Sequence, residues 1–137
     1  MKDSLRPGLS TTKRIVVDQD RTISFMGEEA RVYATPRLIS DIEFTCRHLL
    51  LDHGDEGEDS VGVDVALKHL AATLMGSTVE ITARVVSVEG RKVVFEVAAK
   101  DELEEISVGT HTRYVVDLVK RVERLKAKAA KLTAVKG

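Results

Sequence analysis

The sequence contains few cysteines, little net charge and no long apolar run, and each scarcity excludes a class of protein. Its single cysteine, Cys46, can form neither an intramolecular disulfide nor a zinc site built from cysteines. The 21 basic residues are balanced by 22 acidic ones, so the chain lacks the overall positive charge of many nucleic-acid-binding proteins. No apolar stretch approaches the roughly 20 residues of a membrane-spanning helix. We therefore expect no nucleic-acid partner and no membrane insertion.

The N-terminal stretch also lacks the features of a secretory signal. Met1–Thr12 is polar and is interrupted by Pro7 and Gly8, so no apolar segment follows a basic start. Together with the lone cysteine, this predicts a soluble protein of the reducing cytoplasm.

Apolar, β-branched residues are abundant. Hydrophobic residues make up 43% of the chain, which is enough for a core and argues against disorder. Valine occurs 19 times and isoleucine six times, and both favour strands. The length of 137 residues predicts one domain over residues 1–137.

One long helix is predicted to follow Thr35. Threonine is a good helix N-cap, and Pro36 suits the first helical position, where its missing N–H has no partner to lose. Apolar residues then recur at spacings of three and four up to Leu51: Leu38, Ile39, Ile42, Cys46, Leu49 and Leu50. The helix should therefore be buried on one side.

Strands are predicted on both sides of this helix. Lys13–Asp18 precedes it, and an acidic loop over Asp52–Ser60 follows it. Four strands come next: Val61–His69, Thr78–Val88, Arg91–Lys100 and Ile106–Leu118. Short turns join the last three, which predicts an antiparallel meander. Residues 118–137 return to helical spacing and form a basic C-terminal helix and tail.

This order of elements indicates an α+β fold, because a single helix with a wide apolar face needs a curved antiparallel sheet to enclose it. The hot-dog fold has this arrangement. Periodicity alone also leaves ferredoxin-like and cystatin-like sheets open.

Glu43 is a candidate general base. It falls at the border of the apolar helix stripe, where a carboxylate is partly removed from water and can act on a substrate. The alternative is a structural ion pair with Arg47 one helical turn away, worth a few tenths of a kcal/mol.

Three further residues have a functional and a structural interpretation. The Thr35 hydroxyl lies where helix N–H groups stabilise an anionic oxygen, or it only caps the helix. His69, at a strand end, can transfer protons near neutral pH, or it is a satisfied structural residue. Gly62 either allows close approach of a ligand or marks a bulge in a bent sheet. The four histidines lack the spacing of a metal site, so we expect no metal.

Taken together, these residues resemble one family. Thr35, Glu43, Gly62 and His69, followed by Gly-Thr-His-x-Arg at Gly109–Arg113, resemble the fluoroacetyl-CoA thioesterase family of hot-dog proteins. The motif His69-x-Ala-Ala-Thr is also similar to this family, and the resemblance extends from Met1 to about Val122.

The resemblance implies the fold, the reaction and the site. It implies a hot-dog acyl-CoA thioesterase in which Thr35, Glu43 and His69 are catalytic. Gly62 would lie against the thioester and Arg113 would line the site. It also implies a homodimer with sites shared between subunits, and no cofactor beyond the coenzyme A of the substrate.

The chain departs from the family in the segment before the helix. Two phenylalanines of the fluoroacetyl enzyme's lid correspond here to Met26 and Glu29. We therefore expect hydrolysis of a short or small acyl-CoA without selectivity for the fluorinated group. A hydratase acting on an enoyl thioester and a non-catalytic acyl-CoA-binding module are the alternatives.

Overall fold

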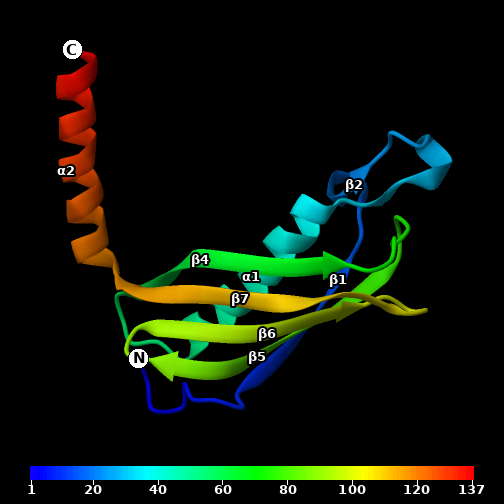
Figure 1. Ribbon diagram of the computed structural model, residues 1–137, viewed down its shortest axis with the longest axis horizontal. Helices are drawn as coiled ribbons and strands as arrows, with labels where there is room; N and C mark the ends of the chain where they lie inside the picture. The colour runs from blue at the N-terminus through cyan, green and yellow to red at the C-terminus, as the bar shows by residue number, and fades with distance from the viewer.

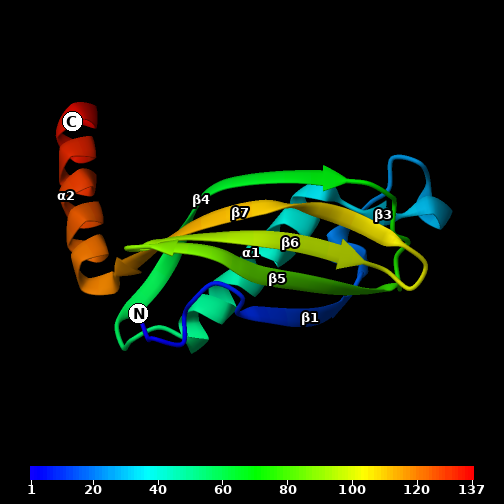
Figure 2. The ribbon, with the colours of Figure 1, turned by 60° about the horizontal axis from the view of Figure 1, so that its bottom comes forward.

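A curved five-stranded antiparallel sheet wraps one long helix in the computed structural model, which describes residues 1–137 (Figures 1 and 2). The strand order is β1-β5-β6-β7-β4. The sheet strands are β1 (Ser10–Val16), β4 (Glu58–His69), β5 (Thr78–Glu89), β6 (Lys92–Lys100) and β7 (Glu105–Asp117), and the helices are α1 (Thr35–Asp52) and α2 (Leu118–Lys136). The predicted α+β class, the meander β5-β6-β7 and both helices are confirmed.

The core lies between α1 and the concave face of the sheet. Most of the predicted helix stripe is buried, including Leu38, Ile42 and Cys46, which are fully inaccessible to solvent. Alternate residues of the meander face these side chains because successive residues of a strand point to opposite faces. The fully buried members from the strands are Val79, Ile81, Ala83, Val85, Val93, Phe95 and Ile106. Cys46 therefore belongs to the core, and burial raises the pKa of its thiol to about 12.

The segment between β1 and α1 has little regular structure. It contains β2 (Thr22–Ile23), which pairs with β3 (Val32–Tyr33). A 3-10 turn at Gln19–Arg21 precedes β2, and a second one at Glu28–Ala30 lies between β2 and β3. The segment extends beyond the end of the sheet (Figure 1).

The acidic loop is shorter than the predicted Asp52–Ser60, because β4 already begins at Glu58. Two of its residues have partners that draw them into the sheet. The Asp59 carboxylate accepts two hydrogen bonds from the Arg47 guanidinium, at 2.9 and 2.7 Å. Ser60 is buried against Arg113. Asp59 and Ser60 therefore belong to the strand although both are polar, because an arginine lies opposite each of them.

β4 is an edge strand whose outer side has no partner. Its inner side pairs with β7, with an irregularity between Gly62 and Asp64 that matches the predicted bulge. At Gly109 the backbone of β4 leaves no room for a side chain, because an added Cβ would lie 2.1 Å from the Ala66 carbonyl oxygen. Val61, Val63 and neighbouring residues are exposed along the free edge. A long, apolar, unpaired edge is a surface that proteins normally cover.

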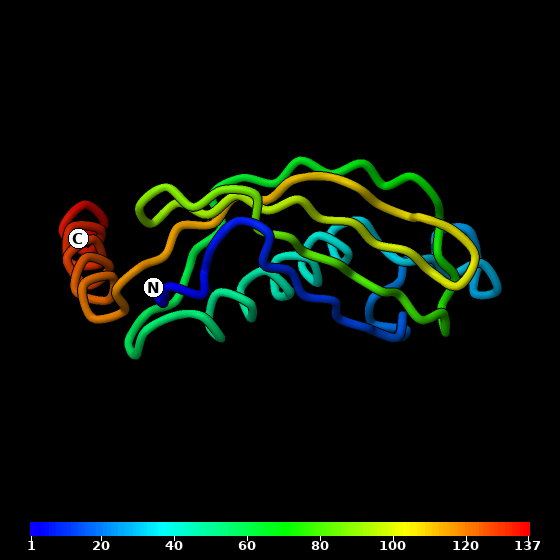
Figure 3. The backbone as a smooth tube through the Cα atoms, turned by 90° about the horizontal axis from the view of Figure 1, so that it is seen from below, coloured from blue at the N-terminus to red at the C-terminus, as the bar shows by residue number.

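The C-terminal helix α2 stands away from the rest of the chain. It leaves the sheet at the end of β7 and extends into solvent without a single buried residue (Figures 1 and 3). No helix is long and apolar enough to cross a membrane.

Candidate functional site

Thr35 and His69 are in contact, although they come from different elements. Thr35 begins α1 and His69 ends β4, and the Thr35 Oγ1 lies 2.7 Å from the His69 Nδ1. The N-cap is Ala34, without a side-chain cap. The prediction that Thr35 caps the helix is therefore wrong, because its hydroxyl is bound by the imidazole.

The other nitrogen of His69 is left open. Its Nε2 is buried and has no hydrogen-bond partner, and burial lowers the pKa of the ring. His69 is thus held neutral. Thr35 and His69 border a hollow of about 330 Å³, whose other lining residues are mostly apolar: Ile23, Val32, Tyr33, Leu70, Ala71 and Ala72. A buried polar atom without a partner is costly, so this nitrogen is suited to a partner that the isolated chain does not supply.

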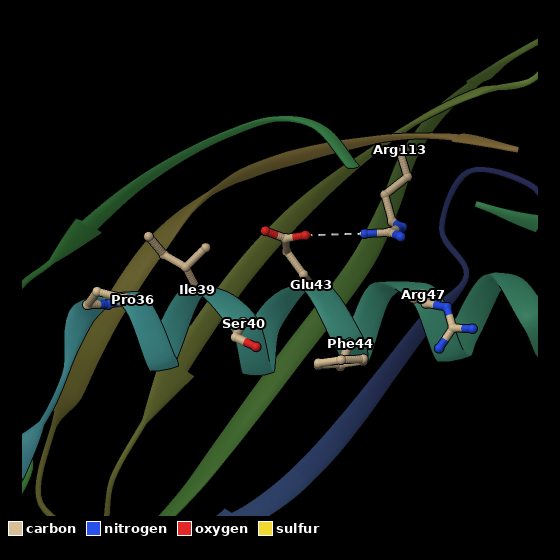
Figure 4. A pocket seen from close by; sticks show the side chains of 7 residues that line it. All are labelled: Pro36, Ile39, Ser40, Glu43, Phe44, Arg47 and Arg113. Atoms are coloured by element: carbon tan, nitrogen blue, oxygen red, sulfur yellow. Dashed lines mark ion pairs between the residues drawn. The ribbon is translucent and has the colours of Figure 1, made fainter. Parts of the chain in front are cut away.

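Glu43 lies at the middle of α1 and faces Arg113 on β7 (Figure 4). The Glu43 Oε2 is 3.6 Å from the Arg113 Nη1, and the Glu43 side chain remains 40% exposed while that of Arg113 is 5% exposed. Arg47 pairs with Asp59 instead. The alternative interpretation of Glu43 as the partner of Arg47 is therefore wrong, because the guanidinium it meets comes from the sheet.

Gly62 completes this cluster by leaving space. A Cβ built on it would lie 3.1 Å from the Glu43 Oε2 and 3.5 Å from the Arg113 Nη1. Any larger residue would crowd the carboxylate. The missing side chain of Gly62 thus lets the backbone of β4 lie directly against Glu43.

Arg113 is held by a buried hydrogen-bond chain. Its Nε donates to the Ser60 Oγ at 2.7 Å and its Nη2 to the Ser60 carbonyl at 2.9 Å. Its Nη1 lies 3.2 Å from the His111 Nε2, and the His111 Nδ1 lies 2.8 Å from the Asp64 carbonyl. A carbonyl only accepts and a guanidinium only donates, so His111 carries its proton on Nδ1. Burial lowers its pKa, which favours this neutral form.

Sequence reasoning did not assign Ser60, Asp64 or His111 to this chain. For His111 a signal existed, because residues two apart on a strand point to the same face, and His111 precedes Arg113 by that spacing. Ser60 gave no such signal, since its contact depends on the pairing of β4 with β7.

Two hollows meet at Glu43. One of about 310 Å³ runs along the exposed face of α1, lined by Pro36, Ile39, Ser40, Glu43, Phe44, Arg47 and Arg113 (Figure 4). Another of about 190 Å³ lies under the free edge of β4, lined by Glu43, Gly62, Val63, Asp64, Val65 and His111. The carboxylate is therefore reachable from outside. No group of three or more His, Cys, Asp or Glu could hold a metal ion.

The predicted site residues form two clusters within the chain. Thr35 is in contact with His69, and Glu43 lies against Gly62 and Arg113. At about 1.5 Å of rise per residue, Thr35 and Glu43 are separated by about 12 Å along the helix. Within one protomer, no hydrogen bond or ion pair joins the Thr35–His69 pair to Glu43 or Arg113.

The comparison with known families decides the identity. The sequence profile described as "Fluoroacetyl-CoA-specific thioesterase" matches residues 17–119. The chain belongs to this family. A fluoroacetyl-CoA thioesterase of Streptantibioticus cattleyicolor is 35% identical over 127 residues, which span 88% of this chain and 91% of that protein.

Solved structures agree. A mutant of the fluoroacetyl-CoA-specific thioesterase has a TM-score of 0.84 and 34% identity, covering 93% of this chain and 99% of the other. A Thermus thermophilus protein described as a thioesterase superfamily member has a TM-score of 0.85 and 29% identity, covering 93% and 96%. This member of the fluoroacetyl-CoA-specific thioesterase family is thus a hot-dog thioester hydrolase, as predicted.

The segment that contains Met26 and Glu29 lies between β2 and β3. Met26 is 53% exposed there, and Glu29 is exposed as well. Neither residue lines the hollows at Glu43 or at His69. The neighbouring Phe25 is 79% exposed and also contributes to none of them.

Proposed function

We propose that this protein hydrolyses a short or small acyl-CoA thioester at a site built from two protomers. The observation that carries the proposal is the exposed Glu43 carboxylate, held between the Arg113 guanidinium and the bare backbone of Gly62. Similarity to a fluoroacetyl-CoA thioesterase supports the reaction class, and one relative was solved with fluoroacetate and CoA. The reaction needs no cofactor, because coenzyme A is part of the substrate.

The free edge of β4 supports a homodimer. Two copies of this edge pair antiparallel about a two-fold axis, which places the start of one β4 beside the end of the other. With the axis between Val65 and Ala66, Gly62 of one protomer lies opposite the partner's His69. The exposed valines of the edge are then covered.

The same axis unites the two clusters. Thr35 contacts His69 and Glu43 lies against Gly62 within each chain. An arrangement that pairs Gly62 with the partner's His69 therefore also brings Glu43 toward the partner's Thr35. The groove along α1 becomes part of the interface, and the open Nε2 of His69 gains a neighbour.

In the proposed mechanism the thioester carbonyl lies between Gly62 and the partner's Thr35. Backbone N–H groups of Gly62 and of the start of the partner's α1 stabilise the oxyanion, each good donor contributing roughly 3–4 kcal/mol. Glu43 removes a proton from a water molecule while the water oxygen forms a bond to the carbonyl carbon. The C–S bond then breaks, and the proton passes to the departing thiolate.

The partner's Thr35 and His69 position the water and support the proton transfer. His69 is neutral because burial lowers its pKa, so its ring can accept a proton. Arg113 stabilises the charge of Glu43 before the attack. Direct attack by the Glu43 carboxylate, giving a transient anhydride, is the alternative route and is recognised by capture of the acyl-enzyme with hydroxylamine.

The acyl group is proposed to be small and not specifically fluorinated. Met26 and Glu29 replace two phenylalanines of the fluoroacetyl enzyme's lid, so the apparent basis for that selectivity is missing. We place the reaction in the cytoplasm on the same sequence grounds as above.

Thiol release from a panel of acyl-CoA esters tests this function, with Glu43→Gln as the control. We expect turnover on short acyl esters, no preference for fluoroacetyl over acetyl, and loss of turnover in the control. Intact binding of acyl-CoA without turnover on any ester would contradict the proposal and favour a binding module.

Mixing two inactive variants tests the shared site. In a heterodimer of Glu43→Gln and His69→Ala protomers, one site carries both substitutions and the other carries neither. We therefore expect about half of the wild-type activity per purified heterodimer. An inactive heterodimer would show that each site lies within one chain.

A further inference from the structure

A second, basic hollow lies where α2 leaves the sheet. It has a volume of about 160 Å³ and is lined by Arg91, Tyr114, Val115, Val116, Asp117, Lys120, Arg121 and Arg124. Three cations come from the first turns of α2, and the fourth comes from the turn between β5 and β6. Figure 1 shows α2 rising from this corner of the sheet.

The positive charge of this hollow is not neutralised by the chain. Lys120, Arg121 and Arg124 form no ion pair. Arg91 reaches the Glu58 carboxylate only at 3.4 Å, and that carboxylate also binds the N-terminal amine. Asp117 accepts the backbone N–H of Lys120 as a helix cap. The hollow therefore has an excess of hydrogen-bond donors for an anion.

The same cations destabilise the helix that carries them. Lys120 and Arg124 are one turn apart on α2, and like charges at this spacing destabilise a helix. Burial does not offset this cost, since α2 has no buried residue. A bound polyanion would remove the repulsion. The half-exposed ring of Tyr114 adds a flat apolar surface beside the charges, on which a base can stack.

Neighbouring residues of β7 and β4 connect the hollow with the cluster around Glu43. Tyr114 directly follows Arg113 on β7 and pairs with Val61, the neighbour of Gly62. Arg113 is buried and Tyr114 is exposed, so the two side chains point to opposite faces of the sheet. Only the edge strand β4 separates the hollow from the free edge.

In the proposed dimer the first residues of β4 extend beyond the paired part of the edge. The partner's β4 ends at the residue opposite Gly62, so the edge from Glu58 to Val61 has no partner strand. A flexible arm can pass there from the Glu43 side of the sheet to the basic hollow.

We propose that Arg91, Tyr114, Lys120, Arg121 and Arg124 bind the phosphorylated adenosine end of coenzyme A while its thioester lies at Glu43. This assignment rests on the proposed thioesterase function for the position of the thioester. The charge and the shape of the hollow do not depend on that function. Arginine and lysine bind phosphate groups through charge-assisted hydrogen bonds, and Tyr114 stacks on the adenine.

Kinetics with two thioesters test the assignment. Acetyl-CoA carries the phosphates and acetyl-pantetheine does not. For the double variant Arg121→Glu/Arg124→Glu we expect the KM for acetyl-CoA to rise at least tenfold with kcat unchanged. Its KM for acetyl-pantetheine stays within twofold of wild type. An equal rise for both thioesters, or no rise for either, would overturn the proposal.

A charge-matched control distinguishes a localised site from a general effect of the positive charge on α2. Lys128→Glu/Lys131→Glu changes the same charge farther along α2, outside the hollow. We expect its KM for acetyl-CoA to change less than twofold. A rise equal to that of the first double variant would contradict a localised site. Because the substituted residues lie on the exposed helix α2, we expect both double variants to unfold at the same temperature as the wild type.

Direct binding keeps the two proposals distinguishable. Calorimetry with CoA, 3′-dephospho-CoA, pantetheine and inorganic phosphate requires no turnover. We expect CoA to bind more tightly than dephospho-CoA and pantetheine, and the Arg121→Glu/Arg124→Glu variant to lose this difference. A protein that binds CoA in this way but hydrolyses no thioester would contradict the proposed function alone. Equal affinities for CoA and pantetheine would contradict the hollow alone.

Discussion

The Thr35–His69 pair and the Glu43–Arg113 cluster solve opposite electrostatic problems. Thr35 and His69 contain no formal charge, and burial keeps the imidazole neutral. Glu43 and Arg113 carry opposite charges at the boundary between core and solvent. The neutral pair makes one hydrogen bond, whereas a buried guanidinium needs a partner for most of its donors. Arg113 accordingly has Ser60 and His111 behind it, while His69 keeps one nitrogen free.

This contrast indicates a division of roles. The charged cluster is rigidly supported and supplies the carboxylate, and the neutral pair has an unused acceptor or donor that a second protomer can reach. Substitutions in one cluster at a time can separate these two roles.

Glu43→Gln should reduce kcat by roughly 10³-fold, since a lost general base typically costs 10²–10⁴-fold. Glutamine keeps the shape of the side chain, so we expect unchanged thermal unfolding. Steady-state thiol release measures the effect. Glu56→Gln, on an exposed residue, is the control and should retain full activity. Near-wild-type turnover of Glu43→Gln would show that this carboxylate is not the base.

His69→Ala should lower kcat by about 10²-fold, because it removes the proton-transfer support but leaves Glu43 and its partners in place. Thr35→Ala should have a smaller effect, and Thr35→Ser should recover most of the rate because serine retains the hydroxyl. The ratio of these rates is measured at saturating acyl-CoA. Equal loss in Thr35→Ser and Thr35→Ala would assign the role of Thr35 to its methyl group.

Arg113→Met should destabilise the protein by about 2 kcal/mol, because it leaves the buried Ser60 and His111 without their donor. Arg113→Lys should be only partly better, since lysine cannot reproduce the forked contact with Ser60. Urea denaturation measures both free energies of unfolding. A lysine variant as stable as wild type would show that charge alone, not the fork, holds the cluster.

The stability should depend on pH through the half-buried His69 and the buried His111. Burial lowers the pKa of His69 and of His111 below the ordinary value of 6.5, so the unfolded chain binds protons more readily than the folded one. The contribution of these two histidines to stability is therefore complete above about pH 6.5 and falls as the pH drops toward the lowered pKa values. Urea denaturation at a series of pH values measures this slope. His111→Asn should reduce it, and His48→Asn, on an exposed residue, should not.

Arg47→Gln should change kcat less than twofold and stability by only about 0.5–1 kcal/mol, as expected for a partly exposed ion pair. Arg47 lines the same groove as Glu43 but binds Asp59. Activity assays and urea denaturation of this variant measure the smallest effect of the series. A large loss of activity would mean that Arg47 acts on Glu43 after all.

Local patterns predicted the elements well. Alternating residues separated by short turns predicted the meander, and the apolar spacing after Pro36 predicted α1. Both signals come from residues near one another in the chain. The Thr35, Glu43, Gly62 and His69 set came from resemblance to a family, and the structure groups them in pairs that the spacing did not show.

The partners of the site residues were not predictable in the same way. Glu43 had a cation at helical spacing, Arg47, and only the pairing of β4 with β7 places Arg113 closer. Likewise Thr35 looked like a helix cap because His69 is distant in sequence. Contacts that depend on the pairing of strands far apart in the chain produce no periodic pattern in the sequence.

The strand order has a kinetic consequence. The strands β5, β6 and β7 follow one another in sequence, so their pairing closes only short loops. Both edge strands, β1 and β4, come earlier in the chain and must join the finished meander across long loops, which makes their addition slower. β4 carries Gly62 and His69 and also the edge that would meet a second copy. We expect a refolding chain to gain its sheet signal before its activity, with the appearance of activity depending on protein concentration.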